Sequence, residues 1–289
     1  MLDLKMPIDG TTQVYGIFGY PVSHSLSPLM HNSQFKRLQM NAVYLAFGVK
    51  PDLLGLAFEA IRSLGIRGVN LTIPHKEMAI EFIDEIPEDL DRCVGALNTV
   101  VNRDGKLYGY NTDVAGFLTA LKEDLGFNPE GKNALVLGAG GAARGAVTAL
   151  ARAHADKIFV HNRTSERAEG LVGYLKSFFP ETDFEVLRSP DGLRPEEVGL
   201  VVNATSAGMK PADPPPFDLT VFKKKICVVD MVYSSVMTAF LNDAKKLGHL
   251  YANGAGMLAA QGALSFELWT GQREGVREGM REVLRQCHL

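Results

Sequence analysis

The chain has 289 residues, of which 46% are hydrophobic and 22% charged, and its formal net charge is -3 at pH 7. This length suits two compact domains better than a single core, and the composition is ordinary for a globular protein. The nearly balanced charge excludes the basic surface that nucleic-acid-binding proteins carry, although an anionic substrate is still compatible with a locally positive cleft.

The cysteines and the apolar runs exclude several further classes of protein. Cys93, Cys227 and Cys287 are widely spaced and form no C-x-x-C pair, which argues against a disulfide framework and a structural zinc site. The N-terminal stretch lacks the apolar segment of a signal peptide, and no run approaches the roughly 18 apolar residues of a membrane span. We therefore expect a cytoplasmic protein with no membrane or nucleic-acid partner.

The first third of the sequence alternates short apolar strands with helices. The clearest helix, over residues 52–64, carries apolar residues at helical spacing and ends at Gly65. Asp104-Gly105, between residues 99–102 and 106–110, is the pattern that predicts a β-hairpin. The remaining predictions are strands over 14–19, 42–47 and 67–72 and helices over 27–39 and 76–84.

From Asp113 onward the pattern changes. A helix over residues 114–125 ends at Gly126 and is followed by short runs rich in Val, Ile and Leu, which are typical of a parallel sheet buried on both faces. These runs, separated by helices or loops, cover residues 133–137, 158–160, 199–202, 226–229 and 250–252. Two closing helices, over 257–270 and 273–286, have no strand after them.

These elements predict an α/β protein of two domains with a cleft between them. An N-terminal α/β substrate domain comprises residues 1–112 and 255–289, and a Rossmann-like, doubly wound domain comprises residues 113–254. Hinge closure is expected to bring the two halves of the cleft together.

A glycine-rich segment directly follows the strand over residues 133–137 and opens a helix. It reads G-x-G-x-x-A, with Ala143 as the small third residue, in the strand–turn–helix context that a dinucleotide site requires. The helix offers its positive N-terminus to a pyrophosphate. The alternative is a turn that only packs the helix on the sheet. The residues expected to bind the cofactor are Gly138, Ala139, Gly140, Gly141 and Ala142.

The end of the next strand indicates which dinucleotide binds. It reads Asn162-Arg163-Thr164, with Arg167 one turn later, and has no Asp or Glu of the kind that binds the ribose 2′-hydroxyl of NAD. An arginine can instead pair with a 2′-phosphate through two hydrogen bonds. The alternative, that these arginines are solvated helix-start residues, conflicts with the helix dipole. The sequence therefore favours NADP over NAD.

Four polar clusters lie at predicted strand ends or helix starts, where open α/β sheets bind their ligands. Ser27-Pro28 opens a helix, so that Ser25, Ser27 and the helix N-terminus can form one pocket for an anion. The alternative is that Ser27 only caps the helix. The clusters are 23–28 (SHSLSP), 70–76 (NLTIPHK), 95–99 (GALNT) and 111–113 (NTD).

With the segments that follow, the sequence resembles the shikimate dehydrogenase family over essentially its whole length. The clusters occur in the family's order and spacing, together with 138–141 (GAGG), 162–164 (NRT), 203–209 (NATSAGM), 230–233 (DMVY), 254–257 (GAGM) and Gln261. One departure is Ser234-Ser235, where the family commonly has Asn-Pro after the tyrosine.

The resemblance implies a reaction and a role for particular residues. The reaction is the reversible, NADP-dependent reduction of 3-dehydroshikimate to shikimate, in which Lys76 and Asp113 form the catalytic pair. Lys76 lies just inside a predicted helix start, where the macrodipole disfavours a cation, which suits proton donation. The implied substrate residues are Ser25, Ser27, Thr72, Lys76, Asn98, Asp113, Tyr233 and Gln261, and Thr205, Met231 and Gly254 are implied on the nicotinamide side.

Several alternatives remain open at this point. Lys76 could be a solvated first-turn residue and Asp113 the N-cap of the next helix. The chain could be a quinate or mixed quinate/shikimate dehydrogenase, or a non-catalytic NADP sensor, although a sensor needs neither Lys76 nor Asp113. No H-x-x-x-H or H-E-x-x-H pattern accompanies the seven histidines, so no metal is expected. We expect a monomer or homodimer that acts on a small molecule.

Overall fold

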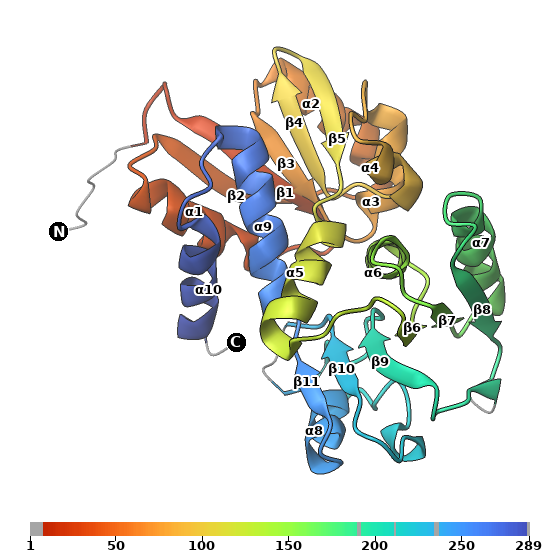
Figure 1. The fold of residues 1–289 in the computed structure, drawn as a ribbon. Coiled ribbons are helices and arrows are strands. Elements are labelled where there is room, and N and C mark those ends of the chain that lie inside the picture. The colour runs from red at the N-terminus through yellow and green to blue at the C-terminus, as the bar shows by residue number, and fades with distance from the viewer. Residues whose placement is uncertain (1–7, 190–191, 211, 234–236, 288–289) are drawn as a thin grey trace. The chain divides into compact units, whose positions relative to one another are not determined.

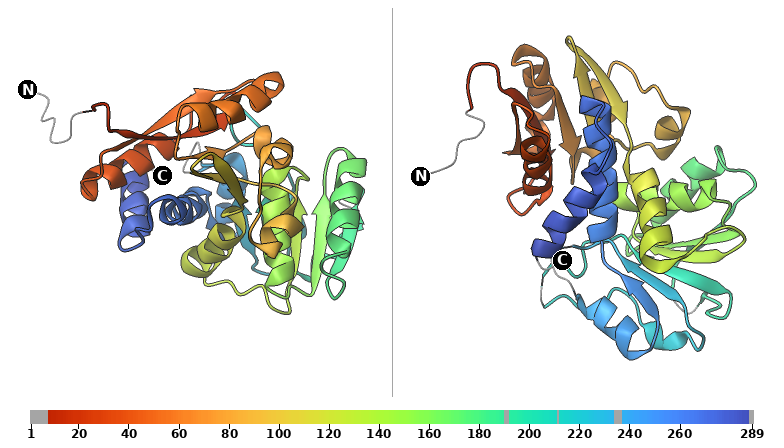
Figure 2. Two further views of the ribbon diagram at one scale, coloured as in Figure 1. Left: turned by 90° about the horizontal axis from the view of Figure 1, so that it is seen from above. Right: turned by 60° about the vertical axis from the view of Figure 1, so that its left-hand side comes forward.

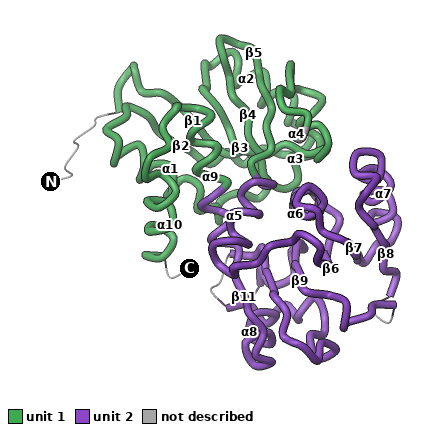
Figure 3. The backbone as a smooth tube through the Cα atoms, in the orientation of Figure 1, with its two compact units in different colours: residues 1–112, 261–287 green, residues 113–260, 288–289 purple. Residues whose placement is uncertain are grey.

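The computed structural model describes residues 8–189, 192–210, 212–233 and 237–287. The chain divides into two compact units, the first of residues 1–112 with 261–287 and the second of residues 113–260 with 288–289 (Figures 1 and 3). Within the described part, no helix has the length and apolar character needed to cross a membrane.

The first unit is built on a mixed five-stranded sheet with strand order β2-β1-β3-β4-β5. β1 runs parallel to β2 and β3, whereas β4 is antiparallel to β3 and β5. The ends of β1, β2, β3 and β5 therefore share one edge of the sheet with the start of β4. The strands are β1 (Gln13–Gly19), β2 (Ala42–Gly48), β3 (Gly68–Leu71), β4 (Thr99–Arg103) and β5 (Lys106–Tyr110).

The predicted hairpin is confirmed. Asp104 and Gly105 both have positive φ angles, 53° and 88°, as a type I′ turn between β4 and β5 requires. The predicted helix over residues 76–84 ends two residues early, at Phe82, and only its first turn is α-helical. A single α-helical turn, α3 (His75–Met78), passes into a 3₁₀ turn (Ala79–Phe82). The backbone amides of Asp84 and Glu85 then donate to the carbonyl of Leu107 in β5, so pairing with this edge strand ends the helix.

The alternation of side chains along β1 explains which helices cover which face of the first sheet. Tyr15 packs against Phe35 and Trp269, with ring centroids 5.2 and 5.4 Å away, whereas Phe18 meets Phe58 on the opposite face. α1 and α9 therefore cover one face and α2 covers the other, and α10 packs against α1 (Figure 2). The helices are α1 (Ser27–Arg37), α2 (Leu54–Ser63), α4 (Asp89–Val94), α9 (Ala255–Thr270) and α10 (Val276–Gln286).

The second unit is built on a six-stranded sheet in which every pairing is parallel. Its order, β8-β7-β6-β9-β10-β11, is the doubly wound order 3-2-1-4-5-6 when β6 is counted as the first strand, so the predicted fold class is confirmed. The strands are β6 (Asn133–Leu137), β7 (Lys157–His161), β8 (Asp183–Leu187), β9 (Val198–Asn203), β10 (Cys227–Asp230) and β11 (Leu250–Ala252).

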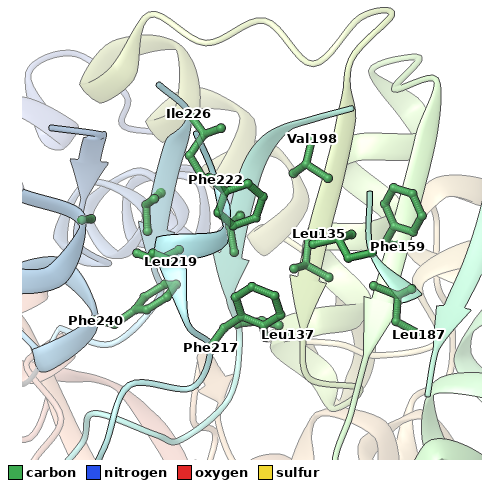
Figure 4. Packing of buried hydrophobic residues seen from close by; sticks show 14 of the residues in the cluster. Leu135, Leu137, Phe159, Leu187, Val198, Phe217, Leu219, Phe222, Ile226 and Phe240 are labelled. Atoms are coloured by element: carbon green, nitrogen blue, oxygen red, sulfur yellow. The ribbon is translucent and has the colours of Figure 1, made fainter. Parts of the chain in front are cut away.

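Burial of this sheet on both faces follows from its strand residues. Leu135 and Leu137 of β6 point into a core with Phe159, Phe217 and Phe240 (Figure 4), while their neighbours along β6 are also buried. The topological switch point, where strand order reverses, lies between β6 and β9. The helices of this unit are α5 (Asp113–Leu125), α6 (Gly141–Arg152), α7 (Ser165–Lys176) and α8 (Ala239–Lys246), and α5 packs against α6.

One histidine in the first unit is buried among aromatic rings. The side chain of His31 stacks on Tyr44 with ring centroids 4.4 Å apart and planes 9° apart. Both ring nitrogens are buried without a hydrogen-bond partner. This burial lowers the pKa of His31 to about 3. The folded protein therefore keeps His31 neutral at pH values at which the unfolded chain binds a proton there.

The pKa of His31 predicts an acid-sensitive stability. In the unfolded chain the imidazole titrates at about 6.5, so the free energy of unfolding falls as the pH drops below that value. At pH 5 the loss from His31 alone is about 2 kcal/mol. His31→Phe, which keeps the ring stack, is expected to remove this part of the decline in urea melts between pH 7 and pH 5. The exposed His24→Phe is the control, and equal declines in both variants contradict the assignment.

Candidate active site

The predicted substrate residues of the first unit gather at one edge of its sheet. Ser25 and Ser27 follow β1, Thr72 and Lys76 follow β3, and Asn98 directly precedes the antiparallel β4. Thr112 follows β5, and Asp113 is the next residue along the chain. The strand directions thus bring together segments that are far apart in sequence, at the edge where open α/β sheets place their ligands.

Backbone hydrogen bonds around Asn98 fix these segments to one another. The carbonyl of Asn98 accepts from the amide of Leu71 at 2.8 Å, and its amide donates to the carbonyl of Tyr110 at 3.1 Å. The amide of Leu97 donates to the carbonyl of Lys76 at 2.8 Å. The backbone of Lys76 is therefore fastened to the residue that precedes Asn98.

The side chain of Asn98 is buried and hydrogen-bonded within the protein. Its Oδ1 accepts from the backbone amide of Thr112 at 2.8 Å, and its Nδ2 donates to Thr112 Oγ1 at 2.8 Å and to Gln261 Oε1 at 3.1 Å. The structure thus brings Asn98 and Gln261 into direct contact. Thr112, which appeared in the sequence only as part of a motif, is the residue that joins this pair to the start of α5.

The two serines after β1 are arranged differently from a simple helix cap. Leu26 occupies the N-cap position of α1 and no side chain caps the helix. The amide of Ser27 instead donates to Ser25 Oγ at 3.3 Å, and Ser27 is buried with 4% of its surface exposed. The alternative that Ser27 only caps α1 is therefore wrong. Both hydroxyls lie beside the first turn of the helix.

Thr72, Lys76 and Asp113 occupy distinct environments. The side chain of Thr72 lies directly over Gly19, where a β-carbon would clash with its methyl group. Lys76 is half-buried in the single turn of α3, and so short a helix contributes little of the macrodipole invoked from the sequence. Asp113, with 3% of its surface exposed, is the first residue of α5. Opposite its β-carbon, α6 carries Gly145.

In the second unit, the glycine-rich turn lies at the topological switch point. Gly138 has a φ of 115°, and a β-carbon there would lie 2.9 Å from the carbonyl oxygen of Ala204, which follows β9. Gly140 forms the N-cap of α6 in an extended conformation, and no atom lies within 4 Å of the place of its missing β-carbon. This open space is what close approach of a ligand to the backbone requires. Gly141 and Ala142 begin α6, and Ala139 is buried.

The predicted 2′-phosphate segment forms the turn between β7 and α7. Asn162 Nδ2 donates to the carbonyl of Thr164 at 2.8 Å, which closes the turn, and Thr164 is the N-cap of α7. The side chains of Arg163, Thr164 and Arg167 are exposed. Two guanidinium groups therefore stand at the carboxyl end of β7, next to the strand that leads into the glycine-rich turn.

A buried carboxylate that sequence reasoning missed organises the loops after β9 and β10. Asp230 accepts hydrogen bonds from Asn203 Nδ2 at 2.9 Å, Thr238 Oγ1 at 2.6 Å and the amide of Val232 at 3.1 Å. Burial raises the pKa of Asp230, while these three hydrogen bonds act in the opposite direction. Asn203 Oδ1 in turn accepts from the hydroxyl of Thr205 at 2.7 Å. The sequence signal for Asp230 is its position at the end of a predicted strand, directly before Met231.

Met231, Tyr233 and Gly254 lie next to this network. The amide of Met231 donates to the carbonyl of Asn203 at 2.9 Å, and that of Gly254 donates to the carbonyl of Val232 at 3.2 Å. A β-carbon on Gly254 would clash with the backbone of Met231. Tyr233 is half-buried, and burial raises the pKa of its hydroxyl. Ser234 and Ser235, the departure from the family pattern, lie outside the described residues.

The second unit also contains a small cavity and a close contact at a glycine. An apolar cavity of about 10 Å³ lies beside Met231 and Gly254, lined also by Phe117, Leu121 and Met257. At the start of α9, Gly256 lies against the carboxylate of Asp124, where a β-carbon would clash. Among the described side chains, no group of three or more His, Cys, Asp or Glu could hold a metal ion.

Three parts of the chain match models of known protein families. Residues 17–100 match the shikimate dehydrogenase substrate binding domain, residues 120–207 match shikimate / quinate 5-dehydrogenase, and residues 254–285 match the shikimate 5′-dehydrogenase C-terminal domain. A curated shikimate dehydrogenase (NADP(+)) from Desulforamulus reducens is 45% identical over 271 residues, which are 91% of this chain and 92% of that protein. The chain belongs to the shikimate dehydrogenase family.

Solved structures agree with this membership. Shikimate 5-dehydrogenase from Thermus thermophilus, in complex with NADP(H) and shikimate, has a TM-score of 0.83 and 37% identity, covering 95% of this chain and 99% of that one. Quinate dehydrogenase from Corynebacterium glutamicum, in complex with NAD, has a TM-score of 0.85 and 28% identity, with the same coverage. The resemblance expected from the motifs is confirmed, as is the enzyme class, an NADP-dependent oxidoreductase.

Proposed function

We propose that this member of the shikimate dehydrogenase family catalyses the reversible, NADP-dependent reduction of 3-dehydroshikimate to shikimate. The observation that carries the proposal is the gathering of Ser25, Ser27, Thr72, Lys76 and Asn98 at one sheet edge, in a chain 45% identical to an NADP-dependent shikimate dehydrogenase. We further propose that residues 1–112 and 255–289 form the substrate domain and residues 113–254 the NADP domain.

The proposed substrate contacts divide by chemistry. Ser25 and Ser27, beside the first turn of α1, bind the carboxylate of the ring acid, because hydroxyls and helix-start amides both donate hydrogen bonds to anions. Tyr233 binds the same carboxylate. Thr72, Asn98 and Gln261 bind the ring hydroxyls, and a site built from such polar groups favours a substrate whose hydroxyls it can pair over an analogue that lacks one.

The proposed proton chemistry involves Lys76 and Asp113. NADPH, when bound, supplies the hydride to the ketone carbon. The ketone oxygen then gains negative charge and takes up a proton, which the Lys76 ammonium gives up; in the reverse direction neutral Lys76 removes the proton from the hydroxyl. Asp113 orients the lysine and holds a ring hydroxyl. Its burial at the start of α5, next to the clamped Thr112, supports this positioning role.

The proposed cofactor contacts follow from the second unit. The open backbone at Gly140 and the helix start at Gly141 and Ala142, with Gly138 and Ala139, suit the pyrophosphate. Arg163 and Arg167, with Asn162 and Thr164, suit the 2′-phosphate and adenine, because a guanidinium pairs with phosphate and stacks on aromatic rings. Thr205, Met231 and Gly254 line the nicotinamide side.

The assay that tests the function pairs each polyol substrate with each cofactor. Purified protein is mixed with shikimate or quinate and with NADP or NAD, and the absorbance of the reduced nicotinamide is followed. The highest kcat/KM is expected for shikimate with NADP. Because quinate dehydrogenases share this fold, a preference for quinate or NAD moves the assignment to that branch. Absence of turnover in all four pairings favours an NADP sensor.

Lys76→Ala is expected to lower kcat about 10²–10⁴-fold, the contribution of a general acid–base group. The KM for NADP and the thermal midpoint should stay near the wild-type values, because Lys76 is fastened through its backbone and is only half-buried. Lys50→Ala, at an exposed lysine of the same unit, is the matched control. A kcat near that of Lys50→Ala shows that Lys76 is not the proton donor.

Arg163→Ala is expected to raise the KM for NADPH while leaving the KM for NADH almost unchanged, because only NADPH carries the 2′-phosphate that this guanidinium binds. Arg188→Ala is the control, since this exposed arginine of the same unit pairs with Glu169 at 2.7 Å. Equal weakening of both cofactors by Arg163→Ala means that Arg163 does not recognise the phosphate.

A further inference from the structure

Behind the proposed substrate edge, the first unit contains a continuous network of buried polar side chains. The network joins two residues proposed to touch the substrate, Asn98 and Gln261, to residues that no part of the proposed function brings to the substrate. None of its members has more than 7% of its surface exposed. The members are Tyr44 in β2, Asn70 in β3, Asn98 just before β4, Thr99 at the start of β4, Thr112 after β5, and Gln261 and Ser265 in α9.

The strand pattern explains why these polar groups meet. Val69 and Leu71 of β3 point into the apolar core on the α2 face, so Asn70 between them points to the α9 face. Thr99 likewise alternates with Val100, which lies in the same apolar core. On α9, Gln261 and Ser265 are four residues apart and therefore lie on one side of the helix.

Backbone groups dictate the direction of each amide in this network. The amide of Thr112 can only donate, so it must face Asn98 Oδ1, at 2.8 Å. Asn98 Nδ2 then faces Gln261 and requires the oxygen Oε1 of that side chain, at 3.1 Å. The Nε2 donor of Gln261 is consequently the end of its amide turned away from Asn98.

The other half of the network is fixed in the same way. The carbonyl of Asn98 can only accept, so it faces Asn70 Nδ2 at 3.0 Å, and Asn70 Oδ1 accepts from the hydroxyl of Tyr44 at 2.7 Å. The hydroxyl of Ser265 lies at the junction, 3.0 Å from Asn70 Nδ2 and 2.7 Å from Thr99 Oγ1. Thr99 Oγ1 is in turn 3.0 Å from Asn98 Oδ1.

We propose that Tyr44, Asn70, Thr99 and Ser265 are positioning residues, which hold the amides of Asn98 and Gln261 in place and thereby determine how well the site binds a ring hydroxyl. The inference rests on the proposed function. Gln261 offers its Nε2 donor to an oxygen of a polyhydroxylated ring acid, and Asn98 cannot flip, because a flip would set two donors against each other at Thr112. Removal of a network hydroxyl leaves this orientation unchanged but takes away a contact that holds Asn98 in place, so both amides shift relative to a bound ring.

The test removes network hydroxyls while preserving side-chain shape. Thr99→Val and Ser265→Ala delete one hydroxyl each, and Thr99→Ser keeps it. Thr148→Val is the matched control, because Thr148 Oγ1 in α6 is buried without a hydrogen-bond partner. For each variant we measure the thermal midpoint, kcat, and the KM values for shikimate and NADP. The same constants are measured for a deoxy analogue of shikimate, which keeps the hydroxyl that is oxidised and lacks one of the others.

In Thr99→Val and Ser265→Ala, the KM for shikimate is expected to rise about tenfold while the KM for NADP changes less than about twofold. The preference for shikimate over the deoxy analogue should fall, and Thr99→Ser should restore it. If Thr99→Val or Ser265→Ala fails to fold, Tyr44→Phe, which deletes the hydroxyl at the far end of the network and keeps the ring stack on His31, should lower the same preference.

Two results overturn the inference. One is kinetic behaviour of Thr99→Val and Ser265→Ala equal to that of Thr148→Val. The other is an equal loss of kcat/KM for shikimate and for the deoxy analogue, which indicates a structural role only. In either case the wild-type enzyme still oxidises shikimate, so the proposed function stands. Failure of the wild-type enzyme itself to oxidise shikimate is the separate result that overturns the function.

Discussion

The position of Asn98 is the constraint on which the arrangement of the first unit depends. Its carbonyl, amide and side chain are bonded to β3, β5, the residue before α5, and α9, so a single buried residue ties together elements drawn from most of the unit. A buried amide with unsatisfied groups costs about 1–3 kcal/mol for each, so alternative packings of these elements are disfavoured. The neighbouring amide of Leu97, which donates to the carbonyl of Lys76, fixes the segment that carries this lysine.

In the second unit, a buried carboxylate, that of Asp230, ties several loops together. Asp230 is buried at the end of β10 and receives three hydrogen bonds, which compensate the cost of removing a carboxylate from water. Its partners Asn203 and Thr238 stand at the end of β9 and at the start of α8. Loops that would otherwise be free to vary are therefore tied to the ends of rigid strands, beside the switch point of the sheet.

Much of this architecture could be predicted, because short apolar runs and turn residues determine the strands and the hairpin locally. The strands over residues 133–137 and 250–252 have the predicted bounds, and the hairpin at Asp104-Gly105 follows from the backbone freedom of these two residues. β8 was not predicted, because its alternating sequence DFEVL at the sheet edge carries a weak signal. The end of α3 was wrongly predicted, because pairing with β5 decides it rather than helical propensity.

The residues of the site could be predicted only where they belong to a recognisable motif. The glycines after β6, the hydroxyls before α1 and the arginines after β7 are examples, because their spacing indicates what they bind. The roles of Ser265 and Asn70 could not be predicted in this way, because they depend on a hydrogen bond between residues 195 positions apart in the sequence. Asp230 likewise reads as an ordinary strand-end acid until Asn203 and Thr238 are seen beside it. Tertiary partners of this kind cannot be deduced from a single sequence.

The spacing of Gln261 and Ser265 in α9 has a consequence for changes in the length of this helix. Gln261 contacts Asn98, and one turn later on the same uninterrupted helix Ser265 contacts Asn70. Each residue added to a helix turns everything beyond it by about 100° and advances it by about 1.5 Å. A loop can absorb an inserted residue, but a residue inserted between Gln261 and Ser265 would turn one of these two side chains away from its partner. This interval of four residues is therefore closed to insertion.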